Sequence, residues 1–107
     1  MPKNLSPVII KTFHELDKEE LYKFIQLRIE VFVVEQDCPY QDLDNLDMQG
    51  RHIWIEEEGK ILSYLRLNPP GIRFNEPSLG RIVTKDTVRS RGLAEIIINK
   101  ALEIIDN

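Results

Sequence analysis

The stretch LGRIVTKDTVRSRGLA, residues 79–94, decides how the chain folds, because a β-rich run leads into a basic, glycine-containing turn that opens a helix. The first amides of a helix lack intrahelical acceptors, and the helix dipole adds a partial positive charge there, so an anionic phosphate fits. Gly92 lets the backbone approach a ligand, and the small Ala94 leaves the site accessible. Arg89 and Arg91 can add charge-assisted hydrogen bonds. The turn therefore predicts a phosphate site; the alternative is an ordinary helix start with solvated arginines.

The segments around this stretch predict an α+β fold. Strands are expected at Val8–Phe13, His52–Glu56, Ile61–Leu67 and Leu79–Thr84. Glu58 and Gly59 predict a hairpin turn between the second and third strands. This order predicts a mixed, largely antiparallel sheet flanked by helices, with residues 1–107 forming a single domain.

Two helices are expected. The first begins at a cap on Asp17, with Glu20 completing a capping box, and ends near Glu35 or Gln36. The second begins near Leu93. Its apolar stripe comprises Leu93, Ile96, Ile97, Ala101 and Ile104, and a second face adds Ile98, Leu102 and Ile105. A helix that is apolar on two sides needs covering on both.

The composition argues against several kinds of partner. Fourteen basic and 18 acidic residues give a net charge of −4, which disfavours nucleic acid. No apolar run reaches the roughly 20 residues of a membrane span, so no membrane partner is expected. The amino-terminal residues lack a secretory signal pattern, and the expected location is cytoplasmic.

Neither cysteine chemistry nor a metal is predicted. Cys38 is the only cysteine, so it has no partner for an internal disulfide and no second thiol for a zinc site. The acidic residues Asp42, Asp44 and Asp47 break the spacing of a calcium loop, which needs oxygen ligands at positions one, three and five and a glycine at six. No metal is therefore expected.

The run RSRGLA, residues 89–94, matches the pyrophosphate signature of the GNAT superfamily: glutamine or arginine, two residues, glycine, one residue, then glycine or alanine. Four other stretches agree with this family, namely VFVVEQDCPYQDLDNLD at 31–47, His52, YLRL at 64–67 and LGRIV at 79–83. Together they resemble the ElaA-like branch of the GNAT N-acetyltransferases. The resemblance covers residues 8–105.

This resemblance implies an enzyme that transfers an acetyl group from acetyl-coenzyme A to a primary amine of a small molecule or protein. It implies that the backbone of Ile82, Val83 and Thr84 pairs with the pantetheine arm and steadies the tetrahedral oxyanion. Without the resemblance, these residues read simply as core strand. The implied contacts to the diphosphate come from Arg89, Ser90, Arg91, Gly92, Leu93 and Ala94.

The acceptor side is expected after the first helix. A protonated amine must lose a proton before its nitrogen attacks, and Glu35 and His52 are candidates to receive it. Tyr40, Asp44 and Asp47 are candidates to hold or line the amine. The alternatives are that the acids belong to a solvated loop and that His52 is structural. Arg66 and Arg81 are expected to meet the acidic loop as an ion-pair network, with structure ahead of catalysis as its role.

A complete domain of this family continues with further strands and a helix, and the general acid is expected there. The resemblance thus implies that the chain is the N-terminal part of the full fold, truncated after the pyrophosphate-binding helix. One expectation is a fragment of a longer enzyme, and the other is a homodimer through the uncovered sheet edge. Either way, weak coenzyme A binding and little activity are expected of the isolated chain. The competing hypothesis is a catalytically inactive GNAT-like module for coenzyme A binding or assembly.

Overall fold

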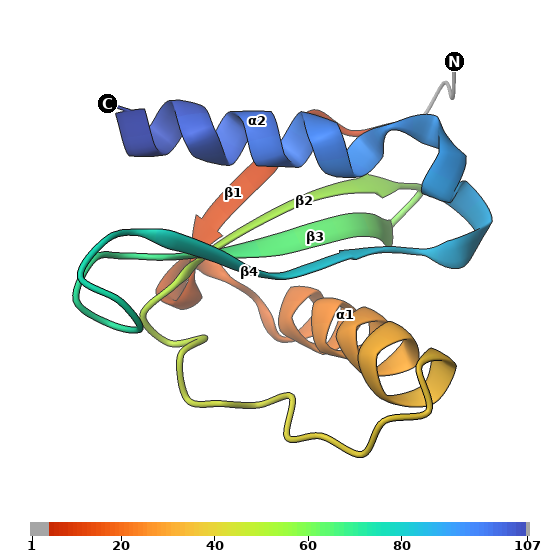
Figure 1. Cartoon of the computed structure of the whole chain (residues 1–107). Coiled ribbons are helices and arrows are strands. Elements are labelled where there is room, and N and C mark those ends of the chain that lie inside the picture. Colours follow the sequence, from red (N-terminus) through yellow and green to blue (C-terminus); the bar gives the residue numbers. More distant parts are fainter. Residues whose placement is uncertain (1–4, 107) are drawn as a thin grey trace.

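A computed structural model describes residues 5–106. It contains a four-stranded sheet in the order β1-β2-β3-β4, with β1 at Ile9–Thr12, β2 at Arg51–Glu57, β3 at Lys60–Asn68 and β4 at Ser78–Thr84. Helix α1 (Lys18–Ile29) lies against one face of this sheet and α2 (Leu93–Asp106) against the other (Figure 1). The predicted helix-flanked α+β fold is therefore confirmed, and β4 forms one edge of the sheet.

The sequence predicted a mixed, largely antiparallel sheet, and all strand pairs within the described residues are antiparallel. The antiparallel pairing of β1 with β2 follows from the first connection. Thr12 at the end of β1 lies opposite Arg51 at the start of β2, because α1 and the loop at 37–50 return the chain to the end of the sheet where β1 finishes. The predicted hairpin turn is confirmed, since Glu58 and Gly59 have φ angles of 51° and 79°.

Side-chain alternation along β2 and β3 gives the sheet two cores. Trp54 and Tyr64, which are cross-strand partners, contribute to the core beneath α1. The neighbouring pair Ile53 and Leu65 contributes to the core beneath α2. Because successive side chains in a strand point to opposite faces, both faces of the central hairpin are buried.

Helix α1 begins as the sequence predicted. The Asp17 side chain accepts a hydrogen bond from the Glu20 amide at 2.8 Å, and the Glu20 side chain returns a contact to the Asp17 amide. The helix continues as a π-helix, η2, over Glu30–Glu35, so the predicted end at Glu35 or Gln36 is confirmed. The change from α-helix to π-helix could not be predicted, because the hydrophobic spacing also fits a continuous α-helix.

Helix α2 covers the second core with Leu93, Ile97 and Ala101. Ile98, Ile104 and Ile105 pack partly against the same core. Ile96 and Leu102 instead remain 46% and 45% exposed, so the predicted placement of Ile96 on the buried stripe is wrong. Within residues 5–106, no helix combines the length and the apolar character needed to cross a bilayer.

Candidate functional site

The free edge of β4 offers backbone groups to a ligand. The Lys85 amide donates to the Leu62 carbonyl at 2.8 Å. In an antiparallel ladder the direction of the peptide groups alternates, so the amide of Thr84 points away from β3. The Thr84 carbonyl accepts a hydrogen bond from Arg89 Nε at 3.1 Å. The side chain of Val83 is buried, and its peptide groups face β3, where its carbonyl accepts a hydrogen bond from Ser63 Oγ at 3.2 Å.

A bulge interrupts β4 just before this edge. Val83 pairs with Tyr64 and Gly80 pairs with Arg66, so that two residues of β4, Arg81 and Ile82, oppose a single residue of β3. Arg81 has a φ angle of 54°, in the left-handed region that non-glycine residues rarely occupy. The side chain of Ile82 is 38% exposed.

The turn that follows β4 is open where α2 begins. A short 3₁₀ helix, η3 (Asp86–Arg91), leads to Gly92, which has a φ angle of 74° and precedes the first residue of α2. Gly92 has no side chain with which to cap the helix amides. A Cβ placed there would meet no atom within 4 Å, so the space beside the backbone is unfilled. The side chain of Leu93 is buried, and this residue offers a ligand only its backbone.

The two arginines of the turn form ion pairs at the surface. Arg89 Nη2 lies 2.7 Å from Glu35 Oε1, and Arg91 Nη2 lies 3.4 Å from Glu57 Oε2. The hydrogen bond from Arg89 lowers the pKa of Glu35. Exposed pairs of this kind are weak because water screens the charges, so an anion can replace either carboxylate at small cost. The structure thus brings Glu35, predicted for the acceptor side, next to the predicted phosphate turn.

The loop at 37–50 is fastened to the α1 side of the sheet by six charged residues, hereafter the arginine–aspartate network: Arg28, Arg66, Arg81, Asp42, Asp44 and Asp47. Asp47 Oδ1 accepts from Arg28 Nη1 at 2.7 Å and from Arg66 Nη1 at 3.0 Å. Asp44 receives two hydrogen bonds of 2.8 Å from Arg66. The predicted meeting of Arg66 and Arg81 with the acidic loop is confirmed.

Arg81 and Arg28 converge on the third aspartate of the network. Asp42 Oδ1 lies 3.2 Å from Arg81 Nε, and Asp42 Oδ2 lies 2.9 Å from Arg28 Nε. These N–H groups are not aligned as hydrogen bonds, and the interaction is an ion pair. The Asp42 carbonyl accepts from Nη2 of Arg28 at 2.9 Å and from Nη2 of Arg81 at 3.0 Å.

His52 is fully buried beside the network, and both of its ring nitrogens are engaged. Nε2 lies 2.9 Å from the Asp47 carbonyl, which can only accept, so this nitrogen carries the proton. Nδ1 then accepts from the Tyr64 hydroxyl at 2.7 Å. Burial lowers the pKa of His52, which keeps the ring neutral. A catalytic role for His52 stays a prediction, and its side chain has no exposed surface.

The other residues predicted for the acceptor side differ in accessibility. Asp47 is 6% exposed, whereas Tyr40 is 41% exposed and lies with its ring 5.0 Å from the Arg81 guanidinium carbon. The side chain of Asp44 is 20% exposed. Asp44 and Tyr40 therefore face the surface near the β4 bulge, and Asp47 lies behind them.

Sequence reasoning missed Arg28, which is fully buried within α1. A signal for it was present. Phe24 and Val31, four residues before and three residues after Arg28, are also buried, so Arg28 occupies a core position of the helix. A charged residue at such a position requires buried partners of opposite charge. The aspartates of the following loop are the nearest candidates along the chain.

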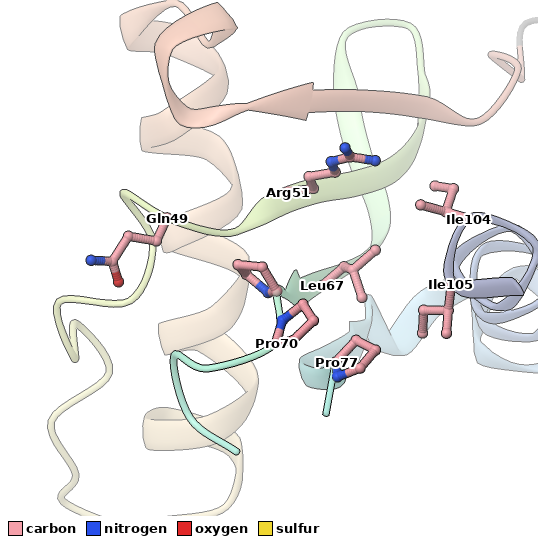
Figure 2. Close-up of a pocket in the computed structure, with 8 residues that line it drawn as sticks. Gln49, Arg51, Leu67, Pro70, Pro77, Ile104 and Ile105 are labelled. Carbon is pink, nitrogen blue, oxygen red and sulfur yellow. The ribbon is translucent and has the colours of Figure 1, made fainter. Parts of the chain in front are cut away.

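A pocket of about 270 Å³ lies near the C-terminal end of α2, at the opposite end of that helix from the turn. Figure 2 shows Ile104 and Ile105 of α2 on one side and the proline-containing loop on another. Its lining residues are Gln49, Arg51, Leu67, Pro69, Pro70, Pro77, Ile104 and Ile105. None of the predicted site residues lines it. Within residues 5–106, no group of three or more His, Cys, Asp or Glu side chains is placed to hold a metal.

Comparison with known proteins agrees with this geometry. Residues 11–107 match the Acetyltransferase (GNAT) family, and the chain belongs to that family. A UPF0039 protein of Synechocystis is 37% identical over 92 residues, covering 85% of this chain and 60% of the relative. Protein ElaA of Escherichia coli K12 is 35% identical over 91 residues, covering 83% and 60%. The chain thus spans about 60% of the length of these curated relatives.

Two solved structures have closely similar folds. An acyl-CoA N-acyltransferase from Pseudomonas aeruginosa has a TM-score of 0.86 at 39% identity, covering 92% of this chain and 68% of that one. Escherichia coli ElaA has the same TM-score at 31% identity and the same coverage. The predicted membership of the ElaA-like branch is confirmed by these neighbours and by the curated relatives.

Replacing Arg28 with alanine will test whether the arginine–aspartate network holds the fold. The substitution leaves Asp42 and Asp47 buried without one of their cations, so the free energy of unfolding should fall by about 3 kcal/mol in urea titrations. Lys100→Ala, which removes an exposed ion pair on α2, should change it by less than about 0.5 kcal/mol. Equal effects of the two substitutions would contradict the assigned role.

The lowered pKa of Asp44 predicts that the free energy of unfolding falls in acid. Partial burial opposes its ionisation, but hydrogen bonds from Arg66 and the Leu46 amide outweigh burial and lower its pKa from 3.8 to about 2. A lowered pKa stabilises the fold above pH 3.8, and this stabilisation disappears as the pH falls toward 2. Urea titrations should show a smaller loss between these pH values for Asp44→Asn than for wild type. Glu76→Gln, at an exposed carboxylate outside the network, should keep the wild-type slope.

Proposed function

We propose that this chain carries the acetyl-coenzyme A site of an N-acetyltransferase that acetylates a primary amine. One observation carries the proposal: the free edge of β4 runs directly into an open turn at the start of α2, where Gly92 leaves the helix amides uncapped and two arginines stand nearby. An extended thioester arm and a diphosphate, joined in one molecule, match an unpaired strand edge followed by an anion-binding helix start. Membership of the GNAT family supports the same assignment.

In this proposal the diphosphate binds residues 89–94. The backbone amides at Gly92, Leu93 and Ala94 donate to its oxygens, and Ser90 adds a hydroxyl. Arg89 and Arg91 exchange their surface carboxylates for phosphate. The unfilled space at Gly92 is the feature that allows a phosphate close to the backbone.

The acetyl end of the donor is proposed to lie along Ile82, Val83 and Thr84. The outward amide of Thr84 is a ready donor to the oxyanion that forms when the amine nitrogen adds to the thioester carbonyl. The new C–N bond forms, the C–S bond then breaks, and the thiolate leaves. The bulge at Arg81 ends regular pairing just before this point, which keeps the backbone of Ile82 out of the β3 ladder.

Glu35 is the proposed acceptor of the amine proton, directly or through a water molecule. Its carboxylate lies at the end of η2 and contacts Arg89, whose Nε donates to the carbonyl of Thr84. The Arg89 side chain therefore links Glu35 to Thr84, where the thioester is proposed to lie. When Arg89 turns to phosphate, the carboxylate loses its cation and becomes available to an ammonium group.

Tyr40 and Asp44 are the proposed acceptor contacts, since Tyr40 is exposed and Asp44 is partly accessible beside the β4 bulge. Asp47 and His52 are proposed to fix the loop behind them. Small amines and protein amino groups both fit this chemistry. A cytoplasmic setting is proposed with it, because acetyl-coenzyme A must be supplied there. A homodimer through the β4 edge would compete with the donor for the same amides, so the proposal assigns that edge to the ligand.

Calorimetry with acetyl-coenzyme A tests the donor site. Replacing Arg89 and Arg91 together with alanine should weaken binding by roughly a hundredfold, because two charge-assisted hydrogen bonds are lost. Arg73→Ala, at an exposed arginine in the loop at 68–77, should bind like wild type. Unchanged affinity in the double variant would exclude this turn as the diphosphate site.

Glu35→Gln separates transfer from binding. With acetyl-coenzyme A and a panel of amines, release of free thiol should slow by roughly a hundredfold at saturating donor, because a general base is lost. Donor affinity should change little, since Arg89 is then free to meet phosphate. Wild-type binding without thiol release on any amine would favour the competing hypothesis of a coenzyme A-binding module. Equal rates in wild type and Glu35→Gln would remove Glu35 from the mechanism.

A further inference from the structure

Arg81 has an unfavourable backbone conformation in the β4 bulge, just before the proposed thioester site. Its φ angle of 54° lies where a side chain crowds the following carbonyl, and only glycine adopts this region freely. It is the first of the two β4 residues in the bulge, and Gly80 directly precedes it. The chain thus uses arginine at the strained position although a glycine is its neighbour. Something in the folded state must hold that conformation.

The contacts of Arg81 with the loop at 37–50 hold this backbone conformation. Arg81 Nε lies 3.2 Å from Asp42 Oδ1, and Nη2 lies 3.1 Å from Asp44 Oδ2. Nη2 also donates to the Asp42 carbonyl at 3.0 Å, and the guanidinium carbon lies 5.0 Å from the centre of the Tyr40 ring. The side chain is 13% exposed. All of these contacts belong to the loop at 37–50, which lies on the α1 side of the sheet (Figure 1).

The direction of the β4 edge depends on these contacts of Arg81. A bulge turns the strand, and every peptide group after it follows the new direction. The residues immediately after Arg81 are Ile82, Val83 and Thr84, whose backbone is the proposed thioester site. Relaxation of residue 81 to an ordinary extended conformation would restore a regular register and rotate these peptide groups.

We propose that Arg81 is a positioning residue for the acetyl donor, which it never needs to touch. Its contacts with Asp42, Asp44 and Tyr40 fix the left-handed bulge, and the bulge aims the backbone of Ile82 and the outward amide of Thr84 at the thioester. The inference rests on the proposed function and adds a direct mechanical link between the acceptor-side loop and the donor strand.

A glycine rescue tests this role. Arg81→Ala keeps the steric penalty and removes the contacts, so the competent bulge becomes a minor population, and acetyl-coenzyme A should bind about tenfold more weakly in calorimetry. Arg81→Gly removes the same contacts but accepts a φ of 54° without penalty, so binding should return to within about threefold of wild type. Lys11→Ala, which removes the ion pair from Lys11 on β1 to Glu20 on α1, is the matched control and should bind like wild type.

Amide NMR spectra of the ligand-free proteins provide the second readout. The signals of Ile82, Val83 and Thr84 should move in Arg81→Ala and stay near their wild-type positions in Arg81→Gly. The inference is overturned if Arg81→Ala binds like wild type, or if Arg81→Gly binds as weakly as Arg81→Ala. Should wild type itself fail to bind acetyl-coenzyme A, the proposed function fails. The ligand-free spectra then still decide whether Arg81 sets the bulge.

Discussion

The structure depends on two guanidinium groups that are wholly removed from water. Arg28 on α1 and Arg66 on β3 have no exposed surface, and a buried charge is tolerated only when it is paired and hydrogen-bonded. Asp47 meets both of them through one carboxylate. The helix, the sheet and the loop at 37–50 are therefore joined at a single point, and the position of the loop follows from the need to neutralise these charges.

The need to pair these buried charges explains how β4 is held by the loop on its α1 face while its edge stays open. The α1 face of β4 is closed by the loop and by Val83, while its edge is left without a partner strand in the described residues. The loop holds the strand from one side, and the open edge faces the proposed donor. His52 and Tyr64 add rigidity behind the loop, because both rings stack against Phe24 and their ring centres lie 5.9 Å apart. The loop that carries the proposed acceptor residues is thus held on a rigid support.

The sequence predicts what is encoded locally. The capping box at Asp17, the hairpin turn at Glu58 and the glycine-containing turn before α2 each depend on neighbouring residues, and the structure contains all three elements where they were expected. The network could be predicted only in outline, because its partners lie 14 to 39 positions apart. No sequence pattern predicts the positive φ angle of Arg81 or the π-helix that follows α1, because tertiary contacts impose both. Sequence reasoning placed His52 on a strand but did not foresee its burial.

The pairing of Arg89 with Glu35 has a consequence for how salt acts on the turn. A turn with two bare arginines would recruit counterions from solution and release them when phosphate arrives. Here each guanidinium already has a protein carboxylate as its counter-charge. At the proposed diphosphate site, binding is then an exchange of one anion for another, in which few solution ions are freed.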